Sequence, residues 1–424
     1  MKRGASPARL AWLALGVLCV WGPARADPAD ALLPDATSVV AALAALPAIR
    51  AARSHIESER SVQRQYRIGP HEWTATATAA RRDQSRPLPE NTVEWELGLE
   101  RAVRLPGKSE AYNRAGQRRA AQAQLALRKV WGEQARLLLE RHATWLRERE
   151  SEHLWRAQAA LLRHYVEAVA KRQRLGDAAR IEREQAEAAG AQAEAQLATS
   201  SGRALAALDA LVRLFPGLAL PPAAPLPVPE PLAGAEGEWI AAQLRHSPEL
   251  AAALGETAVA QAQLGVDTAE RQADPTVGLR VGRARSGAEQ TVGLVLMVPF
   301  GGDYRAAGEA ASRARAEAAA WQQADTQRRV EVEANLRLSE VKVAFAAWQR
   351  HADAAQRLVQ AADSLARGYQ LGEGSLADVL AARRLANEQQ LTATASQVEV
   401  WLSRHRLQLE AGALWALSGP QATR

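Results

Sequence analysis

The chain has 424 residues, 24% of them charged, and a formal charge of +6. Residues 1–26 hold four basic residues and no acidic one, so the rest of the chain carries about +2, a balance that disfavours a nucleic-acid-binding protein. The chain holds a single cysteine, Cys19, which leaves no partner for a disulfide within it.

Residues 1–26 have the pattern of a secretory signal peptide. A basic start is followed by a short apolar run from Leu10 to Val20 and by a small-x-small cleavage site that ends at Ala26. Cys19 lies inside this segment, but Leu18 before it does not fit a lipoprotein signal, which requires a small residue there. We therefore expect cleavage after Ala26, no lipidation, and a mature chain without a disulfide or a thiolate metal site.

Residues 27–214 are predicted to form a first structural repeat. A helical periodicity, with a kink or restart at Pro47, gives way to alternating polar and apolar residues at about 71–80 and 92–101, which predicts two β-strands. The helical pattern then runs from 107 to 214 with one break near Gly176, which predicts a helical hairpin. Its first helix of about seventy residues would extend ~100 Å, a length that implies a rod.

The second half of the chain repeats this order after a proline-rich linker at residues 215–237. Residues 238–413 are predicted as the second repeat, with strands at about 276–283 and 290–298 and a helical hairpin at 302–413, and residues 414–424 as a C-terminal tail. The recurrence of several landmarks in the same order predicts tandem repeats and an α+β fold that is mainly α. The strand-to-helix corners correspond at Pro106, Gly107 and Lys108 in the first repeat and at Pro299, Gly301 and Gly302 in the second.

Each helical hairpin is predicted to reverse at glycines. In the second hairpin, Gly372 and Gly374 can adopt the positive φ of a tight reversal, and Ser375 can cap the following helix. Gly176 marks the equivalent, fainter tip of the first hairpin. Two equivalent tips indicate a function at this end of the helices. An acidic residue lies six positions after the first glycine of each tip: Glu182 and Asp378.

The four predicted strands are each about ten residues long and apolar on one face, as transmembrane β-strands are. Four strands cannot close a barrel, and an open sheet edge is not tolerated in lipid, so several chains would have to pool their strands. Trp73 and Trp95 fit the interfacial positions that tryptophan favours. The alternative is a soluble α+β protein with a small sheet, which leaves helices of ~100 Å unexplained.

Strand parity predicts which side chains would face the lumen of such a barrel. If Trp95, Leu97 and Leu99 face lipid, the alternating acidic residues face the interior, with Arg280 as the main opposing charge. Three copies of the chain would then make an acidic interior. In the alternative interpretation these residues only hydrate the wall of a pore. The acidic residues are Glu94, Glu96 and Glu100, with Glu72 beside them.

The order of elements, the two corner motifs and the stretch Tyr369-x-x-Gly-x-Gly-Ser-Leu-x-Asp-Val-Leu380 resemble the TolC-like outer-membrane efflux protein family, over essentially the whole mature chain. The resemblance implies a homotrimer with a twelve-stranded barrel in the outer membrane and an α-helical tunnel in the periplasm. It also implies two partners, a periplasmic adaptor and an inner-membrane efflux pump, for which we expect the RND type. Such proteins are passive, gated exit ducts, so the resemblance implies no enzyme and no cofactor.

The resemblance also assigns roles at the tips. The family's aspartate at the periplasmic mouth matches Asp378, the tyrosine that helps to hold the mouth closed matches Tyr369, and the acid at the first tip matches Glu182. A ring of such carboxylates would favour cations, whereas in the alternative interpretation both acids only favour helix N-termini. The family's arginine partner is not matched, because Gly374 stands at its position. Three arginines are near enough in sequence to replace it: Arg180, Arg383 and Arg384.

The histidines do not indicate a metal site. His142, His153 and His164 recur every eleven residues on one helix face, but neighbours lie ~16 Å apart along the axis. Shared coordination needs metal–nitrogen bonds of about 2 Å. The sequence also lacks His-Glu-x-x-His, a glycine-rich phosphate loop and a nucleophile elbow, so we predict neither a metal site nor a catalytic site.

The sequence leaves three functions open. The preferred one is an outer-membrane exit duct for divalent heavy-metal cations, because the region from Glu96 to Lys108 resembles the CzcC-like branch of the family. The second is the same duct serving drugs or secreted polypeptides. The third is a periplasmic coiled-coil scaffold without a pore.

Overall fold

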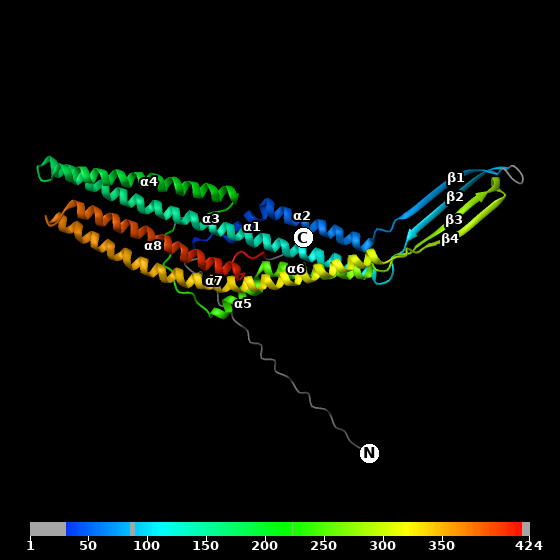
Figure 1. Ribbon diagram of the computed structural model, residues 1–424. Coiled ribbons are helices and arrows are strands. Elements are labelled where there is room, and N and C mark those ends of the chain that lie inside the picture. The colour runs from blue at the N-terminus through cyan, green and yellow to red at the C-terminus, as the bar shows by residue number, and fades with distance from the viewer. Residues whose placement is uncertain (1–30, 85–89, 223, 418–424) are drawn as a thin grey trace, which may run out of the picture.

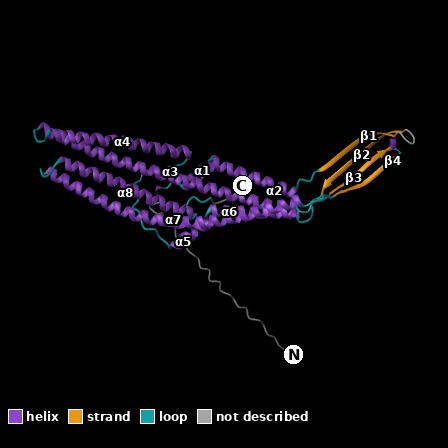
Figure 2. Cartoon of the chain, viewed as in Figure 1, coloured by secondary structure: helices purple, strands orange, loops and turns teal. Residues whose placement is uncertain are grey.

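The computed structural model describes residues 31–84, 90–222 and 224–417, and within these ranges the chain is elongated, with a sheet at one end (Figure 1). Figure 2 shows that strands and helices occupy separate parts of the molecule. The mainly α fold with one antiparallel sheet is confirmed. The predicted signal peptide and the end of the predicted tail lie outside the described residues, and the division of the chain at residues 214, 237 and 413 stays a prediction.

One sheet contains the four described strands in the order β1-β2-β3-β4. The strands are β1 (Trp73–Gln84), β2 (Glu90–Ala102), β3 (Thr276–Ala284) and β4 (Glu289–Met297), with a short 3-10 turn, η2 (Arg285–Gly287), between the last two. Each pairing is antiparallel, and the β2–β3 pair, in which Leu97 lies opposite Val281, joins the two repeats. Each row of paired residues therefore lies on one face of the sheet, because alternate residues of a strand face opposite sides.

Glu72 departs from the prediction because β1 begins at Trp73. The N–H of Glu72 donates to the carbonyl of Pro70 at 3.0 Å, and the ring of the neighbouring His71 lies 3.2 Å from Asp274. These contacts turn the chain before the strand begins. Glu72 therefore lies one residue before β1, and its place on the lumen side stays a prediction.

Two long helical hairpins make up most of the helical part. α3 (Lys108–Arg174) and α4 (Arg180–Leu214) form the first, and α7 (Asp303–Gln370) and α8 (Leu376–Glu410) form the second. With 67 residues in α3 and 68 in α7, each long helix extends ~100 Å. α3 packs against both α4 and α8, and the two tips lie together at the end opposite the sheet (Figure 1).

Four shorter helices lie between the sheet and the middle of the hairpins: α1 (Ala36–Ala45), α2 (Pro47–Ile68), α5 (Glu236–His246) and α6 (Pro248–Ala269). Pro47 and Pro248 begin the second helix of each pair, where a missing N–H costs no hydrogen bond. No single described helix has the length and apolar character needed to cross a membrane; α1 and α2, bent by 66° where they meet, reach that length and apolar composition only when they are taken together. α2 packs on α3, and α6 packs between α3 and α7.

The largest hydrophobic core lies in the middle of the molecule, where α1, α3, the end of α8 and the C-terminal segment meet. The proline-rich segment after α4 runs along this region. Arg149 on α3 donates to the carbonyl of Ala224 at 3.0 Å, and Gln397 on α8 donates to that of Pro227 at 2.8 Å. The segment therefore fastens the two hairpins to each other. The largest side chains of this core are Trp131, Phe215, Trp401 and Trp415.

Candidate functional site at the tips, the sheet and their junction

Both hairpin tips are built by the same glycine turn. Gly176 and Gly372 follow Leu175 and Leu371, the C-cap residues of α3 and α7, and have φ of 86° and 89°, values that favour glycine. In the first tip the N–H of Asp177 donates to the carbonyl of Arg172 at 2.9 Å, and in the second Glu373 donates to Gly368 at 2.8 Å. Each turn thereby satisfies carbonyls that the end of a helix leaves unpaired. The repeat inferred from sequence thus extends to the hydrogen bonds of its turns.

Ser375 and Asp378 form a cap at the start of α8. The Ser375 hydroxyl accepts a hydrogen bond from the Asp378 N–H at 3.2 Å and donates one to the Asp378 carboxylate at 2.7 Å. The carboxylate is exposed and lies in the first helical turn, where negative charge is favoured. Gly374, before the cap, has a φ of 99°, which would strain the arginine found there in the family.

Tyr369 and Glu182 join the two tips. The Tyr369 hydroxyl donates to the Glu182 carboxylate at 3.0 Å, between the last turn of α7 and the first turn of α4. Burial raises the pKa of Tyr369, and its hydrogen bond to Glu182 raises this pKa further. The guanidinium of Arg172 lies over the Tyr369 ring, 5.1 Å from its centre. Sequence reasoning missed Arg172, for which the only signal was its place in the last turn of α3.

The three arginines considered as replacements for the missing family arginine have other partners. Each pairs with an acidic residue of its own hairpin rather than with Tyr369. The pairs are Arg180 with Glu184 at 2.8 Å, Arg383 with Asp363 at 2.6 Å, and Arg384 with Glu388 at 3.0 Å. In this structure Arg172 contacts the tyrosine instead.

One face of the sheet is apolar and uncovered in the single chain. Leu97 lies between Ala77 and Val281 in the register, and the next row toward the helices, with Leu99 and Leu279, is apolar as well. Leu294 on β4 has 90% of its surface exposed and Trp73 on β1 has 60%. An exposed apolar face of this extent marks a surface that meets lipid or another protein.

The opposite face of the sheet carries the predicted lumen acids. Arg280 lies 2.9 Å from Glu100 and 3.6 Å from Glu96, so it contacts two of them. Arg82, which sequence reasoning did not consider, lies 3.3 Å from Glu94. The two arginines offset part of the negative charge of the three glutamates, so this face is less acidic than predicted.

Glycine makes room on this polar face. A Cβ at Gly278 would lie 2.5 Å from the Glu100 side chain, and one at Gly98 would lie 2.5 Å from the Thr76 hydroxyl. Both distances are shorter than a carbon atom tolerates. The glycines that alternate with charged residues therefore let long side chains cross from one strand to the next.

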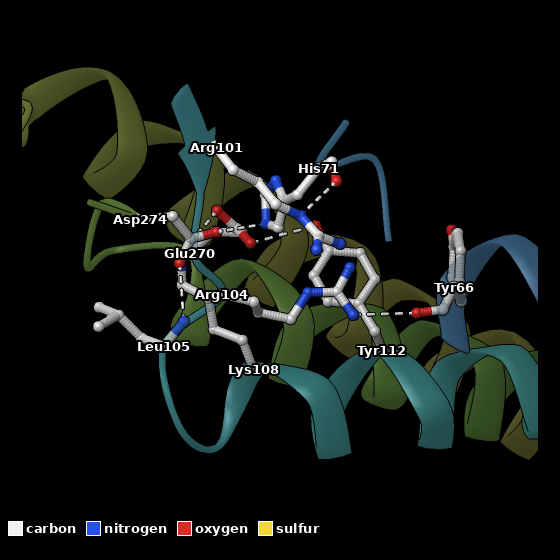
Figure 3. Close-up of polar contacts among 9 residues, drawn as sticks. All are labelled: Tyr66, His71, Arg101, Arg104, Leu105, Lys108, Tyr112, Glu270 and Asp274. Atoms are coloured by element: carbon white, nitrogen blue, oxygen red, sulfur yellow. Dashed lines mark hydrogen bonds and ion pairs between the residues drawn. The ribbon is translucent and has the colours of Figure 1, made fainter. Parts of the chain in front are cut away.

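A buried ionic cluster connects the sheet to the helices (Figure 3). Lys108, the first residue of α3, is only 2% exposed, and its Nζ lies 2.9 Å from Asp274 and 3.1 Å from Glu270. The Leu105 N–H also donates to Asp274, at 3.0 Å. Burial acts to raise the pKa of Asp274, but the hydrogen bonds from Lys108 and Leu105 outweigh it, and the pKa is lowered.

Tyr112 extends this cluster along α3. Its hydroxyl donates to Glu270 at 3.1 Å, while Arg104 lies 4.5 Å from its ring centre and donates to the carbonyl of Tyr66 at 3.0 Å (Figure 3). Burial, followed by the charge of Glu270, raises the pKa of Tyr112 to about 12. With His71 beside Asp274, the cluster ties together the start of β1, the β2–α3 corner and the α6–β3 corner.

The corner between β4 and α7 lacks the contacts of this ionic cluster. Gly301 has a φ of 105° and Gly302 precedes α7, as the corner motif predicts, with Pro299 before them. Phe300 and Tyr304 at this corner are each 94% exposed. In the first repeat, Pro106 and Gly107, with a φ of 87°, lead directly into the buried Lys108. The two corresponding corners therefore have different surroundings in the single chain.

The three equally spaced histidines have different environments. His142 is fully buried, with its Nε2 2.8 Å from the carbonyl of Leu32, whereas His153 and His164 are exposed. Burial lowers the pKa of His142 to about 4. Among the described residues, no group of three or more histidine, cysteine, aspartate or glutamate side chains is placed to hold a metal ion.

The whole chain is similar in fold to solved outer-membrane proteins. The outer-membrane protein VceC of Vibrio cholerae is 18% identical, with a TM-score of 0.71 over 90% of this chain and 96% of its own. CusC, whose structures concern transmembrane channel formation, is 16% identical with a TM-score of 0.66 over 89% and 91%. The outer-membrane channel OprN is 19% identical with a TM-score of 0.66 over 92% and 91%. Neither a family model nor a curated protein sequence matches the chain, so the likeness is one of fold.

Proposed function

We propose that this chain, which has the fold of the TolC-like outer-membrane channels, is the outer-membrane exit duct of a tripartite efflux system. The observation that carries the proposal is the pairing of an uncovered apolar sheet face with helical hairpins ~100 Å long at its end. A sheet of this kind suits lipid on one side, and hairpins of this length suit a tunnel across the periplasm. The duct would lie in the outer membrane with a periplasmic extension.

The edges of the single chain support a homotrimer. Within the described ranges, β1 and β4 each pair with one strand only, and lipid offers no hydrogen bonds to the free edge of a sheet. On α7, Trp321, Val332 and Val343 are exposed and recur every eleven residues, which is three helical turns and one continuous stripe. Three copies would close twelve strands into one barrel and cover these stripes.

The tips support a gate at the periplasmic end. The bond between Tyr369 and Glu182 holds one hairpin against the other, and Asp378 lies on the exposed side of the second tip. Parting of the hairpins would break this bond. We propose that Tyr369, Glu182 and Asp378 form the gate and that a periplasmic adaptor and an inner-membrane pump of the RND type engage this end.

Divalent heavy-metal cations are the substrates we propose for the duct. The carboxylates at both ends of the path favour cations, because a narrow opening concentrates their field. Drugs are the second candidate, favoured by the arginines that offset the glutamates on the polar face of the sheet.

Two experiments test these proposals in turn. Purified protein in planar bilayers should conduct ions and should run as a heat-modifiable trimer, whereas a scaffold without a pore would do neither. A deletion strain should lose tolerance to zinc, cadmium and cobalt while keeping tolerance to dyes and detergents. Unchanged metal tolerance with lost dye tolerance would reject the metal substrate and retain the duct.

A further inference from the structure

The apolar face of the sheet is bounded by tryptophan and arginine at both ends. The register aligns Trp73 with Arg101 at the end near the helices, and aligns Ala79, Trp95 and Arg283 three rows further out. Six residues of strand separate these limits, a distance of ~20 Å at 3.3 Å per residue. We call the rows from Trp73 to Trp95 the apolar band.

The arginine at the inner limit of the band already has partners. The Nε of Arg101 donates to the carbonyl of His71 at 3.0 Å, and its guanidinium lies 5.4 Å from the centre of the Trp73 ring. These contacts belong to the same corner as the buried ionic cluster. Arg101 is therefore engaged by the protein itself.

The arginine at the outer limit has no such partner. Arg283 is exposed, and its guanidinium makes no hydrogen bond or ion pair with any residue that the structure describes. Arg81 lies one row further out, opposite Val93, and is exposed although it lies 3.3 Å from Asp83. On the other face of the same strand, three residues before Arg283, Arg280 is held by Glu96 and Glu100. The guanidinium groups of the polar face are thus neutralised within the chain, and that of Arg283 is not.

An unpaired guanidinium at the edge of an apolar band fits a phosphate group. Arginine is costly within hydrocarbon but favourable at its boundary, and its planar fork matches phosphate oxygens in pairs. Tryptophan in the same row favours the level of the lipid headgroups. Arg81 and Arg283 are two strands and one row apart, or ~12 Å between their backbones, so each would contact a separate phosphate.

We propose that Arg283, assisted by Arg81, binds the phosphate groups of anionic lipids around the end of the sheet remote from the helices. The inference rests on the proposed membrane location and adds a partner to it. Trp95 sets the depth of the sheet, and the arginines select lipids with accessible phosphate. The surface is a boundary of the barrel, separate from its lumen and its gate.

The test compares variants on the two faces of one sheet. Purified full-length protein in dodecyl maltoside is titrated with lipid A, and bound lipid is counted by native mass spectrometry, with phosphatidylcholine as the neutral probe. The double variant Arg81→Gln, Arg283→Gln should bind lipid A at least about tenfold more weakly. Arg280→Gln, which removes the same charge from the polar face, should bind it as the wild type does, and Arg283→Lys should lose less than Arg283→Gln.

The outcomes separate this proposal from the proposed function. Equal lipid A binding by the double variant and the wild type overturns it, as does equal binding of lipid A and phosphatidylcholine by the wild type. Conductance in planar bilayers is recorded for the same preparations. If conductance is present while the lipid preference is absent, the duct stands and the lipid site falls. If conductance is absent from the wild type, the proposed function itself fails.

Discussion

A single buried charge connects the sheet to the helices. Lys108 begins a helix of 67 residues and reaches two carboxylates that precede β3, so one ammonium group fixes the angle between sheet and helices. Such a group is stabilising only while its partners remain, because an unpaired buried charge is costly.

Replacing Lys108 by methionine should therefore lower the free energy of unfolding by about 3–5 kcal/mol, since Asp274 and Glu270 would lose their cation. The matched control is Lys342→Met. Lys342 pairs with Glu236 at an exposed position, where such a pair contributes about 1 kcal/mol or less. Urea unfolding of both variants, followed by tryptophan fluorescence, measures the difference. Equal midpoints would contradict a structural role for the cluster.

His142 should make stability depend on pH. Its pKa is about 4 in the folded chain and about 6.5 when unfolded, so the unfolded chain binds the proton more readily. Stability from this residue is complete above pH 6.5 and is lost as pH falls toward 4, by up to about 3 kcal/mol per chain. His142→Gln should flatten this part of the profile, and His164→Gln, at an exposed position, should leave it unchanged. A thermal unfolding series between pH 7 and 4 checks both.

At the scale of elements, the glycine turns and the bond between the tips determine how the hairpins end and how they are held together. The turns are local, because each one depends on a positive φ and two backbone hydrogen bonds. The bond between tips depends on two helices that are distant in sequence.

Gly372→Ala should destabilise the second tip by about 1 kcal/mol, because alanine is strained at a φ of 89°. Gly202→Ala is the control. Gly202 lies within α4 with open space around it, so alanine should stabilise that helix by about 0.5–1 kcal/mol. Hydrogen exchange at the tip and along α4 resolves the two effects. Protection from exchange should fall at the tip in Gly372→Ala and rise along α4 in Gly202→Ala. Lower protection in both variants would contradict the role of the positive φ in the turn.

Tyr369→Phe should favour the open mouth, because it removes one hydrogen bond to a carboxylate and leaves the ring in place. Such a bond contributes about 1.5–3 kcal/mol, so the ratio of open to closed channels should rise about tenfold or more. Tyr304→Phe, at an exposed corner, is the control. Single-channel recordings measure the open fraction. An unchanged open fraction would remove Tyr369 from the proposed gate.

At the scale of the whole molecule, the single chain leaves several of its surfaces without a partner among the described residues. Both edges of its sheet are unpaired, its apolar band is exposed, and α7 carries a stripe that no described residue covers. Each of these surfaces would be satisfied by further copies or by lipid.

Trp321→Glu should weaken the proposed homotrimer, because it places a charge in the stripe of α7, where Trp321 is 75% exposed in the single chain. Gln322→Glu adds the same charge one residue along the helix and away from the stripe. The fraction of heat-modifiable trimer should fall for Trp321→Glu and should stay at the wild-type level for Gln322→Glu. If neither variant changes it, α7 does not lie at the interface between copies.

The sequence by itself determined the elements and their order, because their signals are local. Alternation with a period of two located the strands, and long helical periodicity located the rods. Glycine at positions 176 and 372 marked the reversals, since few other residues accept their φ. The predicted first strand, at about 71–80, begins two residues before β1, which starts at Trp73.

Only the tertiary structure decided which distant residues meet. Lys108 contacts Asp274 across 166 positions of sequence, and Tyr369 contacts Glu182 across 187, and no local pattern encodes either pair. The same holds for Arg172 above Tyr369 and for Arg82 beside Glu94, which were missed because a lone arginine on a helix or strand carries no positional signal. Periodicity indicates the face on which a side chain lies, but the partner on that face depends on how whole elements pack.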